Sequence, residues 1–118
     1  MPGKPKMTRD QSLGARPVAA VIARREPLAN GSQRLTFSSR PSRWQKAILR
    51  LPDAVERRVE LDPYGIEILD MCDSRTTVRQ IIKRFSKHHR LDLHEAERAV
   101  LMFVRTLVRK GIVTIVAN

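Results

Sequence analysis

The side chains best able to bind a metal or to act as nucleophiles are those of Cys72, His88, His89 and His94, the only cysteine and histidines in the chain. No Cys-x-x-Cys or His-Glu-x-x-His spacing links them, so the sequence predicts no metal site. The pair His88 and His89 is expected at the exposed end of a helix, where imidazolium interacts favourably with the helix dipole. Cys72 follows an isoleucine- and leucine-rich segment and is expected to be a small buried hydrophobic side chain.

No glycine-rich phosphate loop and no pairing of a nucleophile with a base is recognisable in the sequence. We therefore expect a protein that is not an enzyme and that needs no cofactor. The single cysteine cannot form an internal disulfide, and no apolar run approaches the roughly 20 residues required to cross a bilayer. The sequence accordingly predicts a cytoplasmic protein without a membrane span.

The chain is strongly basic, with a formal net charge of +11, and most of the excess lies in the first half of the sequence. A positive field of this kind attracts nucleic acid, an anionic membrane surface or an acidic peptide. Charge alone does not choose among these three partners.

The elements that would position functional residues begin after a long N-terminal segment. Residues 1–32 are rich in Pro, Gly, Ala and Arg without a sustained period of 2 or 3.6, and such a segment does not offset its ordering entropy. We expect a basic, mostly disordered tail over residues 1–32 and one domain over residues 33–118. Within the tail, only the apolar run from Val18 to Ala23 suggests a short strand.

Three segments with alternating or strand-compatible patterns follow. They are Arg34–Ser38, Trp44–Leu51 and Arg57–Leu61, separated by turn-forming residues that include Pro41 and Pro52. We expect three short antiparallel strands, of which the middle one has the weakest pattern.

Three helices are then marked by their start signals. Asp62-Pro63 places an N-cap acceptor before a proline at the first helical position, and Thr77 with Gln80 has the spacing of a capping box. Asp92 opens a third and longer helix, which is expected to end at Gly111. The β-branched run Ile112–Val116 predicts a final strand. The fold class is therefore α+β and winged-helix-like, with a three-stranded antiparallel N-terminal sheet, a three-helix bundle and a short C-terminal strand.

This order of elements carries residues that resemble a known family. Val59-Glu60-Leu61-Asp62 leads into Ile66 and Ile68-Leu69, Cys72-Asp73-Ser74-Arg75-Thr76-Thr77 follows, and Phe103, Leu107 and Lys110-Gly111-Ile112 close the pattern. The sequence thereby resembles the pyrroloquinoline quinone biosynthesis protein D (PqqD) family. It departs from that family at Ser74, where glycine is usual, and in its basic tail and Arg43-Trp44-Gln45-Lys46 segment.

The resemblance implies a non-catalytic module that recognises the leader segment of a ribosomally made precursor peptide. Such modules bind the leader as an added strand and present it to a modifying enzyme, such as a radical SAM maturase. The implied peptide-binding residues are Arg57, Arg58, Val59, Glu60 and Leu61 on the strand edge, with Leu101, Val104, Arg105 and Val108 on the facing helix. Arg57 and Arg58 would also steer an acidic leader. Such a chain is expected to be a monomer or a weak dimer.

Other interpretations of these residues stay open. Leu101, Val104 and Val108 are also consistent with simple core packing, and Arg57 and Arg58 with a charged edge that resists aggregation. The alternative function is nucleic-acid binding through a basic surface. Base reading by the third helix is disfavoured because its first turns carry Asp92, Glu95 and Glu97, which would face phosphates. Backbone contacts by the exposed basic residues need only accessible positive charge.

Overall fold

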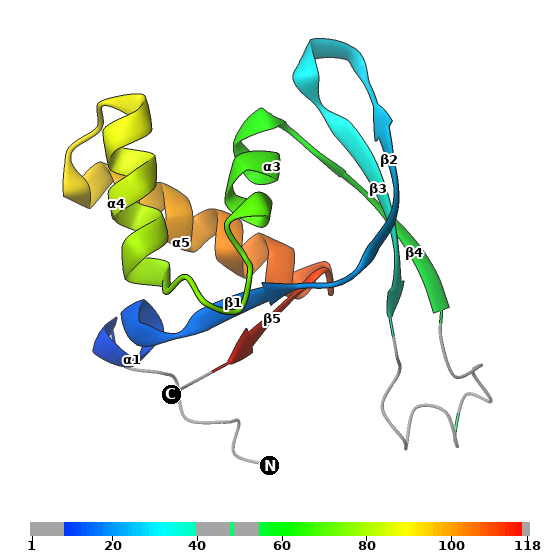
Figure 1. The fold of residues 1–118 in the computed structure, drawn as a ribbon, viewed down its shortest axis with the longest axis horizontal. Coiled ribbons are helices and arrows are strands. Elements are labelled where there is room, and N and C mark those ends of the chain that lie inside the picture. Colours follow the sequence, from blue (N-terminus) through cyan, green and yellow to red (C-terminus); the bar gives the residue numbers. More distant parts are fainter. Residues whose placement is uncertain (1–8, 40–47, 49–54, 117–118) are drawn as a thin grey trace.

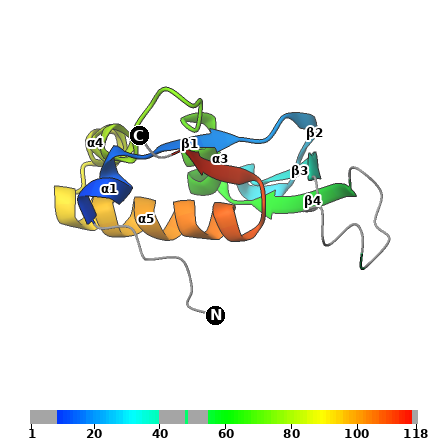
Figure 2. The ribbon, with the colours of Figure 1, turned by 90° about the horizontal axis from the view of Figure 1, so that it is seen from below.

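The computed structural model describes residues 9–39, residue 48 and residues 55–116. It is an α+β structure in which a bundle of helices packs beside a three-stranded antiparallel sheet, and a separate pair of strands lies across the longest helix (Figure 1, Figure 2). This confirms the fold class expected from the sequence and is compatible with a winged-helix-like architecture.

The three-stranded sheet has the order β2-β3-β4, formed by Ile22–Pro27, Gln33–Ser39 and Val55–Leu61. Alternation along the strands turns one face toward the core, where Leu35 and Phe37 are completely buried and Val59 and Leu61 nearly so. In the β3–β4 pairing Leu35 lies opposite Val59 and Phe37 lies opposite Arg57. Both β3 and β4 thus contribute to the hydrophobic core, and α3 packs against β4.

The helices begin where the sequence predicts them. α3 (Pro63–Asp70) has Asp62 as its N-cap, and the Asp62 carboxylate accepts a hydrogen bond from the Gly65 amide at 2.7 Å. α4 (Val78–His89) has the predicted capping box. The backbone N–H of Gln80 donates to the Thr77 hydroxyl at 3.2 Å, and the backbone N–H of Thr77 donates to the side-chain oxygen of Gln80 at 2.9 Å. These reciprocal bonds satisfy donors that the first turn of a helix leaves free.

The longest helix, α5 (Leu93–Arg109), starts at Asp92, whose side chain accepts from the Glu95 amide. It packs against α4 and α3 and is followed by Gly111, whose φ of 81° turns the chain back into β5 (Val113–Val116). Buried Ala96, Val100, Val104 and Leu107 form its core-facing side.

The largest difference from the sequence prediction concerns the expected disordered tail. Residues 9–31 form α1 (Arg9–Gly14), β1 (Arg16–Ala19), β2 and a 3-10 turn, η1 (Ala29–Gly31). β1 pairs with β5 at the other end of the chain, and Leu13 and Ala15 are buried in the core. The tail expectation is wrong here. The partner of β1 is distant in sequence and local periodicity does not reveal such a pairing, whereas β2 forms a hairpin with the neighbouring strand β3.

The predicted middle strand, Trp44–Leu51, lies outside the described residues except for Ile48, which is exposed. β3 and β4 pair directly with each other, and β2 is the third strand of the sheet. The strand pattern at residues 34–38 and 57–61 is confirmed, whereas the third member comes from the segment assigned to the tail.

Candidate functional site

β4 is a regular strand at one edge of the three-stranded sheet. All seven of its residues pair in continuous register with β3, and no described strand pairs with its other side. Such an edge offers a row of backbone donors and acceptors to an extended peptide. All five predicted strand residues lie on β4: Arg57, Arg58 and Glu60 are exposed, and Val59 and Leu61 point into the core.

β2, the opposite edge of the same sheet, is much less suited to pairing. Its register with β3 shifts between Ile22 and Arg24, and it ends at Pro27, which has no backbone donor. Both features are known means of protecting sheet edges from further strand addition. Of the two edges of this sheet, β4 alone offers a regular row of backbone donors and acceptors within the described residues.

The outer face of the sheet holds an exposed network of charges. Arg34 donates to Glu60 at 2.9 Å and also lies 3.7 Å from Glu26, while Arg58 lies 3.5 Å from Glu56. These solvent-screened pairs contribute little to stability. They partly neutralise Arg58 and Glu60, so a peptide at this edge meets a mixed pattern of charge.

Arg57 lies on the core-facing side of the sheet, opposite Phe37, and reaches toward the end of α5. A Cβ atom placed on Gly111 would lie 2.9 Å from a guanidinium nitrogen of Arg57. The β4 edge and the C-terminal end of α5 are therefore neighbours, and Arg57 lies between them.

The predicted helix residues Leu101, Val104, Arg105 and Val108 all line a pocket of about 690 Å³. The pocket is mostly apolar, and its other walls come from Ser12, Ala15, Val78, Ile115 and the side chains of Glu97 and Arg109. The structure thus brings the four α5 residues together, but opposite α1 with the following Ala15, the start of α4 and β5. None of the predicted β4 residues lines this pocket.

The turn after α3 is tightly organised around Asp73. Its carboxylate accepts hydrogen bonds from the Arg75 and Thr76 amides and from the Thr76 hydroxyl. The amide of Thr76 and then that of Arg75 lower the pKa of Asp73. Ser74, which stands where the family usually has glycine, has a φ of 69° in the left-handed region that glycine adopts most easily.

Cys72 is buried, as predicted, and its thiol donates to the carbonyl of Ile68. Burial, followed by the negative charges of Asp73 and Asp70, raises the pKa of the Cys72 thiol to about 12. A thiol in this state is a poor nucleophile, because the thiolate is the reactive form.

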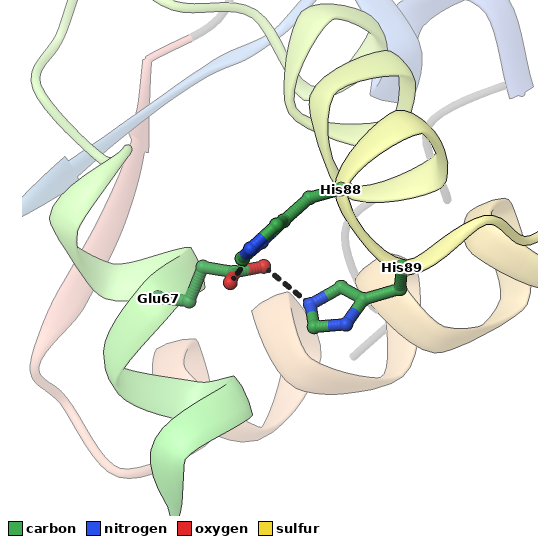
Figure 3. A group of neighbouring side chains, drawn as sticks. All are labelled: Glu67, His88 and His89. Carbon is green, nitrogen blue, oxygen red and sulfur yellow. Dashed lines mark hydrogen bonds and ion pairs between the residues drawn. The ribbon is translucent and has the colours of Figure 1, made fainter.

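A cluster of one carboxylate and two histidines, which the sequence patterns did not predict, joins α3 to the end of α4 (Figure 3). Glu67 places its two carboxylate oxygens 2.7 Å from Nδ1 of His88 and 2.8 Å from Nε2 of His89. The potential ligand atoms of the three residues all lie within 4.8 Å of one another. Glu67 is distant from the histidine pair in sequence, so no local motif signals the cluster.

None of the described helices is long and apolar enough to cross a membrane. Neither the curated proteins nor the solved structures include a match to this chain. Residues 51–113, which include β4, α3, α4 and α5, match the family model described as coenzyme PQQ synthesis protein D (PqqD), and the chain therefore belongs to the PqqD family.

Proposed function

We propose that this protein is a non-catalytic adaptor that binds a precursor peptide as an additional strand along β4 and presents it to a modifying enzyme. Membership of the PqqD family supports an accessory role in cofactor biosynthesis. The observation that carries the proposal is the seven-residue β4 strand, continuous in register and unpaired on its outer side by any described strand.

Strand addition at β4 is favoured by the contrast between the two edges of the sheet. A bound peptide gains main-chain hydrogen bonds along an uninterrupted strand, whereas the bulge and Pro27 interrupt the same pattern on β2. The peptide would thus extend the sheet as a fourth strand, in the order β2-β3-β4-peptide.

The net charge of the chain favours encounter with a peptide that carries acidic residues, while the charge at the β4 edge itself is mixed. Arg57 and Arg58 are exposed on β4, and the whole chain carries a net charge of +11. Positive potential of this kind raises the rate of encounter with an acidic partner more than it raises the final affinity.

The α5 pocket offers apolar contacts near one end of the same edge. Val108 and Arg109 line the pocket in the last turn of α5, and Arg57 on β4 covers the adjacent Gly111. A peptide leaving the β4 edge near Arg57 would cross only the end of α5 to place apolar side chains in the pocket. We therefore assign Leu101, Val104, Arg105 and Val108 to a second part of the peptide-binding surface.

The test begins with a library of displayed peptides selected against the intact chain, followed by amide hydrogen exchange of the complex with one selected peptide. Strand addition slows exchange of alternate β4 amides and leaves the β2 amides unchanged, so β2 serves as the internal control. Protection confined to β2, or spread over α4 without β4, would refute strand addition at this edge.

Matched substitutions separate the two parts of the surface. Val108→Asp places a charge in the pocket, whereas Met102→Asp places one at an exposed α5 position that does not line it. We expect the first to weaken binding of the selected peptide about tenfold or more, since it replaces an apolar contact by a charged group that is costly to bury, and the second to leave it unchanged. Equal effects would exclude the pocket from the peptide-binding surface.

Charge reversal tests steering. Arg57→Glu with Arg58→Glu is expected to slow association with an acidic peptide, and the control Lys83→Glu with Lys87→Glu, on exposed positions of α4, is expected to change it less. If the chain selects no peptide but binds nucleic acid, and the α4 pair abolishes that binding, the adaptor proposal fails and the basic surface of α4 is the functional site.

A further inference from the structure

The cluster of Glu67, His88 and His89 lies away from both surfaces described above. Glu67 projects from α3 and the two histidines from the last turn of α4, so the three side chains converge from two helices (Figure 3). Each imidazole contacts a different oxygen of one carboxylate, at 2.7 Å and 2.8 Å.

We propose that this cluster is a binding site for a divalent transition-metal ion, with Zn²⁺ as the representative ion. Two imidazole nitrogens and a carboxylate form one of the donor sets that zinc uses when it keeps a fourth position for water or another ligand. Nothing in the proposed peptide-binding function requires this site, so the two proposals stand independently.

The geometry is close to what zinc requires. Zn–N and Zn–O distances of about 2.0–2.2 Å place tetrahedral ligand atoms about 3.3 Å apart. The ligand atoms here lie within 4.8 Å of one another, and the two imidazole–carboxylate distances are already shorter than that spacing requires. Side-chain shifts on the order of 1 Å would bring all three atoms to a common ion.

The surroundings support a preorganised site. The side chains of Glu67 and His89 are only 25% and 24% exposed, whereas that of His88 is 68% exposed and has room to rotate. His89 is held between aromatic rings, with centroid distances of 4.4 Å to Phe85 and 5.2 Å to Tyr64. His89 is thus restrained by its neighbours, and the more exposed His88 can close on the ion.

Nearby charge acts in both directions. The negative end of the α4 helix dipole favours a cation, whereas Lys87 and Arg90 flank the histidine pair with positive charge. The Glu67 carboxylate supplies the negative charge that a divalent cation needs. The ion would connect α3 to α4, which already contact each other through Tyr64 and the rings of Phe85 and His89.

The test uses the intact chain freed of metal and titrated with Zn²⁺ in a calorimeter at about pH 7.5. Co²⁺ then serves as a spectroscopic probe, because a low-symmetry four-coordinate site gives strong visible absorption. One ion per chain is expected, together with a rise in the melting temperature that increases with ion concentration.

Glu67→Gln and His88→Ala are the informative variants, because both leave the contacts of His89 with Phe85 and Tyr64 in place. Each is expected to lower zinc affinity by roughly tenfold or more, since removal even of supporting residues around a zinc site costs about 10–100-fold. The control is His94→Ala, which removes an exposed histidine outside the cluster and should leave affinity unchanged.

Circular dichroism of each variant verifies the fold. Absence of zinc binding by the unaltered chain would overturn the proposal. Binding that survives both cluster substitutions, or that His94→Ala reduces equally, would also overturn it, because the ion would then be held elsewhere.

Discussion

Leu13 provides the sharpest test of how the N-terminal segment contributes to the fold. Its side chain is 4% exposed and belongs to the main hydrophobic core, although the composition of residues 1–32 predicted a disordered tail. Leu13→Ala removes a large buried side chain without adding charge or altering a cap. If α1 is docked as described, the loss combines transfer of the side chain with the cavity left behind, about 2–5 kcal/mol. If the segment were disordered, the loss would be close to zero.

The matched control is Val21→Ala, since Val21 lies in the same segment but is 88% exposed. Urea unfolding monitored by circular dichroism gives both free energies, and the slope of the transition should stay the same. We expect Val21→Ala to change stability by less than about 0.5 kcal/mol. A Leu13→Ala variant that unfolds at the same urea concentration as the Val21→Ala variant would refute the docking of α1.

A pair of truncations extends the same reasoning to the whole segment. Removal of residues 1–8 is the control, since it leaves α1 and every later described element in place. Removal of residues 1–32 deletes β1 and β2, and with them the backbone hydrogen bonds from Ala19 to the carbonyl of Cys72 and from Ala20 to that of Ile112. The shorter chain is expected to lose cooperative unfolding. A fully cooperative transition in that chain would show that residues 33–118 fold independently.

Four further predictions follow from local geometry. Thr77→Ala should destabilise the chain by about 1 kcal/mol in urea unfolding, whereas Thr77→Ser should retain the capping box. Gly111→Ala should lower the free energy of unfolding by about 1 kcal/mol, because a φ of 81° is unfavourable for a residue with a side chain. The control Gly14→Ala should not destabilise the chain, because its Cβ would meet nothing within 4 Å. Equal urea transitions for the two variants would contradict this prediction. The Cys72 thiol, with a pKa raised to about 12, should react with a thiol reagent at about pH 8 only as fast as the chain opens; rapid labelling of the folded protein would contradict its burial. The pKa of Asp73 is lowered in the folded chain, so its carboxylate stabilises the fold at pH values above the ordinary aspartate pKa of about 3.9. This contribution is lost as the pH falls through the lowered pKa. The difference in unfolding free energy between the unaltered chain and Asp73→Asn should therefore shrink on acidification.

The helices were predictable from sequence because their signals are local. Asp62-Pro63, Thr77 with Gln80, and Asp92 each fix a helix start through hydrogen bonds within one turn, and all three are present as N-caps. The stripe Leu101, Val104 and Val108 was also recognisable, since its members share one side of a helix. What sequence did not supply is the opposite wall of the pocket, which comes from α1, Ala15, the start of α4 and β5.

The missed features depend on contacts between distant segments. β1 pairs with β5 across almost the whole chain, and Glu67 meets His88 and His89 only because α3 and the end of α4 lie side by side. A short run such as Val18–Ala23 carries too little periodicity to identify a partner. The sequence therefore showed two adjacent histidines but no neighbouring third ligand, and the Glu67 carboxylate that joins them is identified only by the three-dimensional structure.

The added N-terminal strands also bear on which part of the sheet is available for binding. The family match begins at residue 51 and so includes β4, whereas β2 and β3 precede it. β2 occupies one side of β3, and its bulge and Pro27 make its own outer edge a poor template. Any strand added to this sheet is thereby directed to β4, the member of the sheet that lies within the family-matched segment. The upstream strands would then act in peptide binding without contacting the peptide, by stabilising β4 and by leaving it as the only regular edge of this sheet among the described residues.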